Sequence, residues 1–142
     1  MARYLLDTNI LVYVVNRDDD SLSKDVQSIL MDYENEFLIC IETIRELIVA
    51  YRRKKLMARL FRTPIEMVES LQRNYGIRVI QTDMEVMRTL AKMTINELEQ
   101  HYDPSDHVII AQAITMRLPL ISSDHKFTFY RSQGLDLIFN QK

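Results

Sequence analysis

Short apolar runs alternate along this chain with longer stretches in which apolar residues recur every three or four positions. The short runs are typical of buried strands, which we predict at residues 4–6, 37–41, 77–80 and 118–122, with a fifth over 135–139 at the sheet edge. The longer stretches predict helices between the strands. Because this alternation is typical of βαβ units, the pattern indicates an α/β fold with a mostly parallel five-stranded sheet flanked by helices.

Capping residues and prolines mark where the predicted helices begin. Thr63, Asp83 and Asp103 are expected N-caps, because their side chains can accept hydrogen bonds from the free N–H groups of a first helical turn. Pro64 and Pro104 follow two of these caps, at a position where proline fits a helix. The expected helices cover residues 10–15, from Ser21 or Ser23 to about 33, 42–56, 64 to about 74, 84 to about 97, and 104 to the residue before Pro119.

Length and composition fit one globular domain spanning residues 1–142. With 142 residues, 47 % of them hydrophobic and 27 % charged, the chain can bury a single core and is close to the average of soluble proteins. No segment has the pattern of a signal peptide or a membrane span, so we expect a cytoplasmic protein that does not bind membranes. The one cysteine, Cys40, lies in an apolar run and is expected to be an inert core thiol.

The charge of the chain is small in total and uneven in its distribution. A net charge of −2 gives no reason to expect the whole molecule to attract nucleic acid. A dense basic run near residue 52 could contact phosphates, although such a run on a helix is commonly just a solvated surface. The run comprises Arg52, Arg53, Lys54 and Lys55, followed by Arg59 and Arg62.

Four carboxylates stand where predicted elements begin or end. Asp7 directly follows the first strand, and Asp124 follows the fourth. Glu46 lies one turn into the helix after the second strand, and Asp106 lies in the first turn of the helix before the fourth strand. Ligands of open parallel sheets bind beyond the carboxyl ends of the strands. If the first and fourth strands are neighbours, all four acids can therefore converge above one edge of the sheet.

A cluster of this kind favours bound metal. Like charges held close together oppose ionisation, and a divalent cation removes that repulsion. Carboxylate oxygens suit Mg²⁺ or Mn²⁺, and two such ions can clamp the attacking and leaving oxygens of a phosphodiester. The pattern therefore indicates metal-dependent hydrolysis of nucleic acid.

Each acid also has a purely structural interpretation. An acid after a strand commonly caps the turn or helix that follows it, and Asp106 suits the acidic third position of a helix capped by Asp103. Glu42 lies one turn before Glu46 on the same helical face and competes with it for the role of ligand. The metal interpretation depends on these acids arising together at strand ends and helix starts in one small domain.

Several segments, taken together, carry the pattern of a known family. They are Asp7-Thr8-Asn9-Ile10-Leu11-Val12-Tyr13, Thr43-Ile44-Arg45-Glu46-Leu47, Asp103-Pro104-Ser105-Asp106 with Ile110-Ala111-Gln112-Ala113, and Leu118-Pro119-Leu120-Ile121-Ser122-Ser123-Asp124 with Phe127 and Tyr130. In their order and spacing, over nearly the whole chain, these segments resemble PIN-domain ribonucleases, in particular the VapC-like toxins of toxin–antitoxin pairs. The resemblance implies a PIN-like three-layer sandwich, with the parallel sheet between layers of helices.

The resemblance also implies roles for individual residues. It assigns the binding of Mg²⁺ or Mn²⁺ and catalysis to Asp7, Glu46, Asp106 and Asp124. It assigns supporting roles to Thr8, Asn9, Asp103 and Ser122. His101 matches a subgroup of the family and is given no catalytic role. The chain departs from the family at Cys40, where a small residue is common, and at His107, where arginine is common and a phosphate contact would be weakened.

The expected function is that of a divalent-metal-dependent endoribonuclease. Its RNA substrate would be held by basic residues of the run that begins at Arg52, and the resemblance implies a cognate antitoxin and a homodimer. One alternative is an inactive PIN-like protein that binds RNA or a partner. Another is a phosphatase of the haloacid dehalogenase type, which also opens with a strand and an Asp but normally has a second Asp where Asn9 stands.

Overall fold

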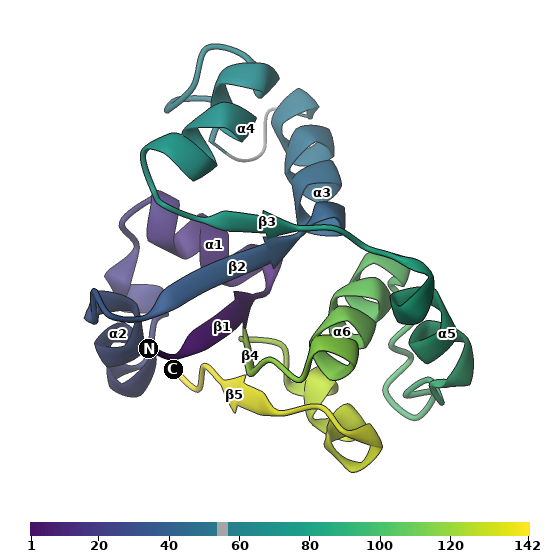
Figure 1. Ribbon diagram of the computed structural model, residues 1–142. Helices are drawn as coiled ribbons and strands as arrows, with labels where there is room; N and C mark the ends of the chain where they lie inside the picture. Colours follow the sequence, from purple (N-terminus) through teal and green to yellow (C-terminus); the bar gives the residue numbers. More distant parts are fainter. Residues whose placement is uncertain (54–56) are drawn as a thin grey trace.

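A five-stranded parallel sheet forms the centre of the computed structural model, which describes residues 1–53 and 57–142 (Figure 1). Its strands are β1 (Arg3–Leu6), β2 (Glu36–Cys40), β3 (Arg78–Ile80), β4 (Leu120–Ser122) and β5 (Leu137–Phe139). Their order across the sheet is β3-β2-β1-β4-β5, and every neighbouring pair is parallel. The predicted α/β fold is confirmed, and residues 135–139 do contribute the edge strand β5.

β1 occupies the middle of the sheet. It pairs with β2 on one side and with β4 on the other, where Leu5 lies opposite Leu120 and Leu6 opposite Ile121. The first and fourth strands are therefore neighbours, although 115 residues separate Asp7 from Ser122 along the chain. This pairing is the condition on which the convergence of the acids depended.

Helices fill the intervals between the strands. They are α1 (Thr8–Val15), α2 (Lys24–Met31), α3 (Ile41–Arg52), α4 (Pro64–Arg73), α5 (Met84–Lys92) and α6 (Pro104–Met116), with 3₁₀ segments η1 (Asp19–Ser21) and η2 (His125–Gln133). The side chains of Thr63, Asp83 and Asp103 cap α4, α5 and α6 as predicted. Of the two serines proposed for α2, Ser23 is the cap. α3 ends at Arg52 rather than running to residue 56, and residues 54–56 lie outside the described part of the chain.

The prediction of a helix from residue 84 to about residue 97 is wrong at its C-terminal end, because α5 ends at Lys92. After Lys92 the backbone forms hydrogen bonds with side chains that are distant in the sequence. The side-chain amide of Gln133 accepts from the Thr94 N–H at 2.8 Å and donates to the Thr94 carbonyl at 2.9 Å. The Asn96 N–H donates to the hydroxyl of Tyr130. These tertiary bonds replace the helical ones and create a loop between α5 and α6.

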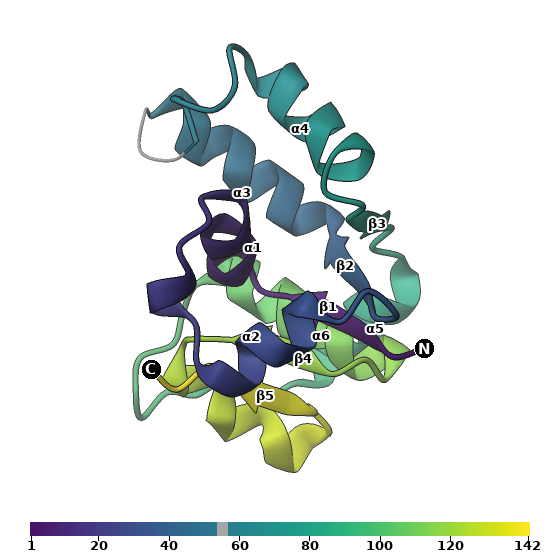
Figure 2. The same cartoon turned by 90° about the vertical axis from the view of Figure 1, so that its left-hand side faces the viewer.

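Two hydrophobic clusters cover the two faces of the sheet. Leu6 belongs to one cluster, with side chains of α1 to α4, and Leu5 to the other, with side chains of α6 and η2. Figures 1 and 2 show the helices α3 and α4 on one side of the sheet and α6 on the other. This division follows from the alternation of side chains along a strand. α5 packs on α6, and Thr115 donates a hydrogen bond to Thr89 across their contact. The three-layer arrangement implied by the sequence is therefore present.

Two further expectations concern the core and membranes. Cys40 is fully buried in the cluster with α6, and burial raises the pKa of its thiol, which agrees with an inert core cysteine. No helix within residues 1–53 and 57–142 is long and apolar enough to cross a membrane.

Candidate metal centre

Asp7 and Asp124 lie side by side because they follow neighbouring strands. Asp7 comes directly after β1, and its N–H donates to the carbonyl of Ile121 in β4 at 3.0 Å. Asp124 lies two residues beyond the end of β4. Both residues therefore stand at the carboxyl edge of the sheet, where open parallel sheets bind their ligands.

Asp7 is almost completely buried, with 4 % of its surface exposed. One carboxylate oxygen accepts from the N–H of Thr8 at 2.8 Å, which makes Asp7 the N-cap of α1. The other accepts from the hydroxyl of Ser122 at 2.7 Å, and Ser122 in turn accepts from the N–H of Asp124 at 3.1 Å. A carboxylate can accept about four hydrogen bonds or metal contacts, so capping leaves room for a cation.

Glu46 lies in the first half of α3, where burial and also the charge of the nearby Asp7 raise its pKa. The hydroxyl of Thr8 donates to its carboxylate at 2.6 Å and so ties the start of α1 to α3. Glu42, the rival one turn earlier, is already paired with Arg45 and with the hydroxyl of Ser105. Burial alone would raise the pKa of Glu42, but these hydrogen bonds lower it overall. The geometry therefore favours Glu46 over Glu42 as the acid of this helix.

Asp106 lies in the first turn of α6, which Asp103 caps by accepting from the N–H of Ser105. A carboxylate oxygen of Asp106 lies within 4.8 Å of oxygens of both Glu46 and Asp103. Asp106 also belongs to a second group, in which its carboxylate, that of Asp124 and a ring nitrogen of His101 lie within 4.8 Å of one another. Asp106 therefore links the acid on α3 to the acid after β4.

The four predicted acids, Asp7, Glu46, Asp106 and Asp124, are called the acidic centre below. Burial, together with the charges of neighbouring acids, raises the pKa of Asp7 to about 7 and that of Asp106 to about 7. The pKa of Glu46 is also raised, by burial and then by the charges of Asp7 and Asp103, although its bond from Thr8 opposes the shift. Burial is the largest cause of these shifts, and the repulsion among the acids that adds to it is what a bound divalent cation would relieve. Closely spaced carboxylate oxygens of this kind fit Mg²⁺ or Mn²⁺.

The predicted supporting residues differ in how the structure places them. Thr8 and Ser122 donate hydrogen bonds to members of the acidic centre. Asp103 caps α6 and lies close to Glu46 and Asp106. Asn9 is exposed on the first turn of α1, and within residues 1–53 and 57–142 its side chain makes no hydrogen bond to the acidic centre, unlike its neighbour Thr8. Its supporting role stays a prediction.

The basic run is only partly described. Arg52 ends α3 and Arg53 follows it, and both are exposed. Six residues of helix, about 9 Å, separate Arg52 from Glu46 along α3. Lys54 and Lys55 lie outside the described residues. Phosphate binding by this run stays a prediction.

Sequence reasoning missed one contact to the acidic centre. The Nε2 atom of His101 lies 2.9 Å from a carboxylate oxygen of Asp106, and His101 is buried, with 2 % of its surface exposed. Its position five residues before Asp106, on the loop that leads into α6, was the available signal. The signal was insufficient because Tyr130, which orients the ring of His101, lies 29 residues later in the chain.

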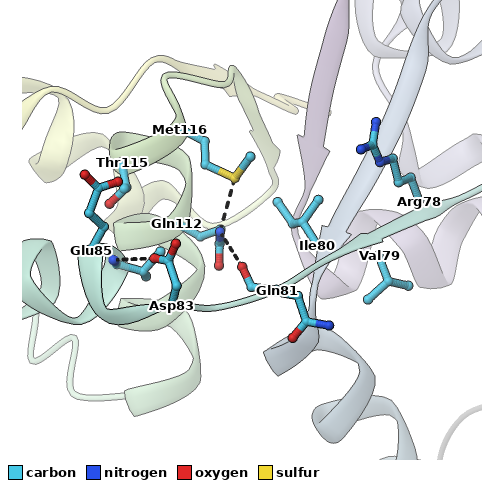
Figure 3. Close-up of a pocket in the computed structure, with 10 residues that line it drawn as sticks. Arg78, Val79, Ile80, Gln81, Asp83, Glu85, Gln112, Thr115 and Met116 are labelled. Atoms are coloured by element: carbon cyan, nitrogen blue, oxygen red, sulfur yellow. Dashed lines mark hydrogen bonds between the residues drawn. The ribbon is translucent and has the colours of Figure 1, made fainter.

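A pocket of about 430 Å³ lies elsewhere, between β3 and the helices α5 and α6 (Figure 3). The amide of Gln112 is central to it. This amide donates to the carbonyl of Gln81 and to the sulfur of Met116, and accepts from the hydroxyl of Thr82. Because these groups already satisfy one another, Gln112 joins α6 to the end of β3 and is not left free for a ligand.

Comparisons with known proteins agree with this fold. The sequence matches the family described as PIN domain over residues 4–132. One similar solved structure is that of VapBC2 from Rickettsia felis bound to a DNA fragment from its promoter. The two sequences are 22 % identical, the match covers 98 % of this chain and 99 % of that chain, and the TM-score is 0.69.

Two further solved structures are similar over their whole length. VapBC-1 from nontypeable Haemophilus influenzae is 20 % identical, with 99 % of each chain covered and a TM-score of 0.71. VapBC-5 from Mycobacterium tuberculosis, a member of the VapBC family of toxin–antitoxin systems, is 16 % identical, with 100 % of each chain covered and a TM-score of 0.61. No curated protein matches the chain. At these identities the likeness concerns the fold.

Proposed function

Since the chain belongs to the PIN domain family, we propose that it is a divalent-metal-dependent endoribonuclease and the toxin of a toxin–antitoxin pair. The acidic centre is the observation that carries this proposal. Carboxylate oxygens of Asp106 lie within 4.8 Å of those of Glu46 and of Asp124, and burial with the charges of Asp106 and Asp124 raises the pKa of Asp7 to about 7. Helix capping accounts for Asp7 and Asp124, which cap α1 and η2, but not for Glu46, which lies inside α3.

Asp7, Glu46, Asp106 and Asp124 would hold Mg²⁺ or Mn²⁺, which when bound would activate water and neutralise charge on the scissile phosphate. The chain's own hydroxyl groups keep these acids in place. Thr8 holds Glu46, and Ser122 holds Asp7 while it accepts from the N–H of Asp124. Arg52 and Arg53 would bind backbone phosphates of the RNA, since such contacts position a strand without reading its sequence.

The first test replaces Asp7 by Asn, which keeps the size of the side chain and removes its charge. Asp7→Asn should abolish RNA cleavage and weaken Mn²⁺ binding while the far-UV circular dichroism stays that of the parent protein. Sequencing of RNA fragments after induced expression, with this variant as control, would also identify the RNA that is cut. Full cleavage by Asp7→Asn in metal-depleted buffer would overturn the proposal.

The toxin role predicts a protein partner. The similar structures named above are of VapBC proteins, and by that likeness we propose a cognate antitoxin and a homodimer for this chain. Co-expression with the product of the adjacent gene, followed by light scattering of the purified material, would measure both. Growth arrest that the neighbouring product does not relieve would contradict the antitoxin, and a monomer at micromolar concentration would contradict the dimer.

The two alternative functions, a phosphatase and an inactive PIN-like protein, are disfavoured to different degrees. PIN membership and the parallel sheet give no support to a haloacid-dehalogenase-type phosphatase, and the position of its second Asp is held by Asn9. An inactive PIN-like binding protein would share the fold. It is disfavoured because all four acids are present and converge. Isothermal titration with Mn²⁺ distinguishes it, since a protein of this kind would bind no metal even with RNA present.

A further inference from the structure

A buried chain of hydrogen bonds ends on Asp106. It begins at the backbone N–H of Asn96, which donates to the hydroxyl oxygen of Tyr130 at 3.1 Å. That oxygen lies 2.9 Å from Nδ1 of His101, and Nε2 of His101 lies 2.9 Å from Oδ2 of Asp106. Tyr130 is fully buried and His101 nearly so, which shields these bonds from competing water.

The partners of Tyr130 fix the direction of the chain. Because the Asn96 N–H already donates to the hydroxyl oxygen, the hydroxyl proton is directed to Nδ1 of His101, and the imidazole proton then lies on Nε2, facing Asp106. The other neutral tautomer would direct two donors at the hydroxyl oxygen of Tyr130 and leave its proton without an acceptor. It would also set a nitrogen lone pair against the carboxylate. A buried group left unpaired in this way costs about 1–3 kcal/mol.

His107 holds the backbone of the same histidine. Its Nε2 lies 2.8 Å from the carbonyl oxygen of His101, which can only accept, so His107 is the donor. The two rings meet edge to face, with centroids 5.1 Å apart, and Phe127 packs against His101 with a centroid separation of 5.4 Å. At the position where arginine is common in the family that the sequence resembles, this chain therefore places a residue that supports His101.

We propose that His101 is a positioning residue that donates its Nε2 proton to Asp106 and so orients this carboxylate for a divalent cation. The proposal rests on the proposed metal-dependent function. His101 is not itself a metal ligand, because Nε2 is directed to Asp106 and Nδ1 to Tyr130. Partners that orient a metal ligand commonly change metal affinity by about 10- to 100-fold when they are removed.

The tautomer of His101 can be measured on the unaltered protein, so this test does not depend on whether a variant folds. In a long-range ¹H–¹⁵N spectrum of protein loaded with Mg²⁺, we expect His101 with a protonated Nε2 and an unprotonated Nδ1. Electron spin echo measurements on the Mn²⁺-loaded protein should show no coupling to ¹⁴N of a bound imidazole. A His101 protonated on Nδ1, or a strong histidine coupling to Mn²⁺, would overturn the proposal.

Variants then test the effect on metal affinity. His101→Ala should raise the Kd for Mn²⁺ by about 10- to 100-fold in isothermal titration. His101→Gln should recover most of this loss, because its amide can donate from near the position of Nε2. His125→Gln is the matched control, since His125 is exposed and pairs with Glu99.

The outcomes separate this proposal from the function on which it rests. If the unaltered protein bound no Mn²⁺, the proposed function would fail. If it bound Mn²⁺ and folded His101→Ala bound it equally well, only the positioning role would fail. If His101→Ala did not fold, a weaker Mn²⁺ affinity of Tyr130→Phe, which loses the hydroxyl that selects the tautomer, would support the proposal, and an unchanged affinity would overturn it.

Discussion

Asp7 and Asp106 are the residues whose charge state depends most on metal. In the metal-free protein each has a pKa of about 7, because burial and neighbouring acids oppose its ionisation. Below that pH both carboxyls are largely protonated. A cation must therefore displace protons to bind, and it meets less competition as the pH rises.

Mn²⁺ affinity should accordingly increase with pH and level off above pH 7. For each proton displaced, the increase is about tenfold per pH unit below the pKa. Titrations at several pH values, in buffers with different ionisation enthalpies, would give both the affinity and the number of protons released. Asp106→Asn should release fewer protons than the parent chain. An affinity that is independent of pH across this range would contradict the expectation.

Ser122 makes the second prediction at the residue scale. Its hydroxyl donates to Asp7 and accepts from the N–H of Asp124, and it is fully buried. Ser122→Ala should lower the free energy of unfolding by about 1–3 kcal/mol, because it leaves buried groups unpaired. It should also weaken Mn²⁺ binding at neutral pH, because the bond from Ser122 lowers the pKa of Asp7.

Chemical denaturation and metal titration of the same Ser122→Ala sample would measure both effects. Ser132→Ala provides the control, since Ser132 is exposed and its hydroxyl donates to the backbone carbonyl of Phe129 at 3.4 Å. Equal stability of the two variants would show that the buried hydroxyl contributes little.

The places of the four acids at strand ends and near helix starts could be predicted because their signal is local, whereas their role as metal ligands stays a prediction. Asp7 and Asp124 follow strands, Asp106 lies in the first turn of α6 and Glu46 lies one turn into α3, and such positions can be recognised in the sequence. The local pattern alone left Glu42 as a rival of Glu46, since the hydroxyl of Ser105 that bonds to Glu42 is 63 residues away along the chain. The contact of His101 was missed for the same reason, because its orienting partner Tyr130 lies 29 residues later.

At the scale of elements, starts were predicted better than ends. The caps Thr63, Asp83 and Asp103 act within one turn of their helices, so the local sequence determines them. The end of α5 depends on Gln133, whose amide bonds to both backbone groups of Thr94. No pattern within the helix itself carries that information.

Gln133→Ala should therefore loosen the loop between α5 and α6. Two hydrogen bonds are lost, each contributing about 0.5–1.5 kcal/mol, so the Thr94 amide should exchange with deuterium faster than in the parent chain. Hydrogen exchange followed by mass spectrometry or NMR would measure the change. Gln141→Ala, at an exposed position, is the control. Unchanged protection at Thr94 would mean that other contacts end the helix.

At the scale of the whole molecule, the net charge is small, and the acidic and basic residues lie in different places. A net charge of −2 with an acidic centre would repel RNA, so binding must depend on local cations. Arg52 and Arg53 are exposed at the end of α3, away from the acids that the sheet gathers. This division predicts that RNA binding depends on a few phosphate contacts.

Charge reversal tests the arginines directly. In an Asp7→Asn background, which should not cut the probe, Arg52→Glu with Arg53→Glu should weaken binding of a short RNA and reduce the slope of log affinity against log salt by about one per lost phosphate contact. Fluorescence anisotropy at several salt concentrations would measure it. Arg88→Glu on α5 is the control. If the slope were unchanged, the basic run would serve another partner.

The pairing of β1 with β4 has a consequence for how the protein is made. The first acid is synthesised at residue 7 and the last at residue 124, and they meet only when the two strands pair across almost the whole chain. Contacts so distant in sequence slow folding, because a long loop must close before they can form. A growing chain on the ribosome therefore carries no complete centre until residue 124 has emerged, so until then an RNA-cutting activity would be withheld from the machinery that translates it.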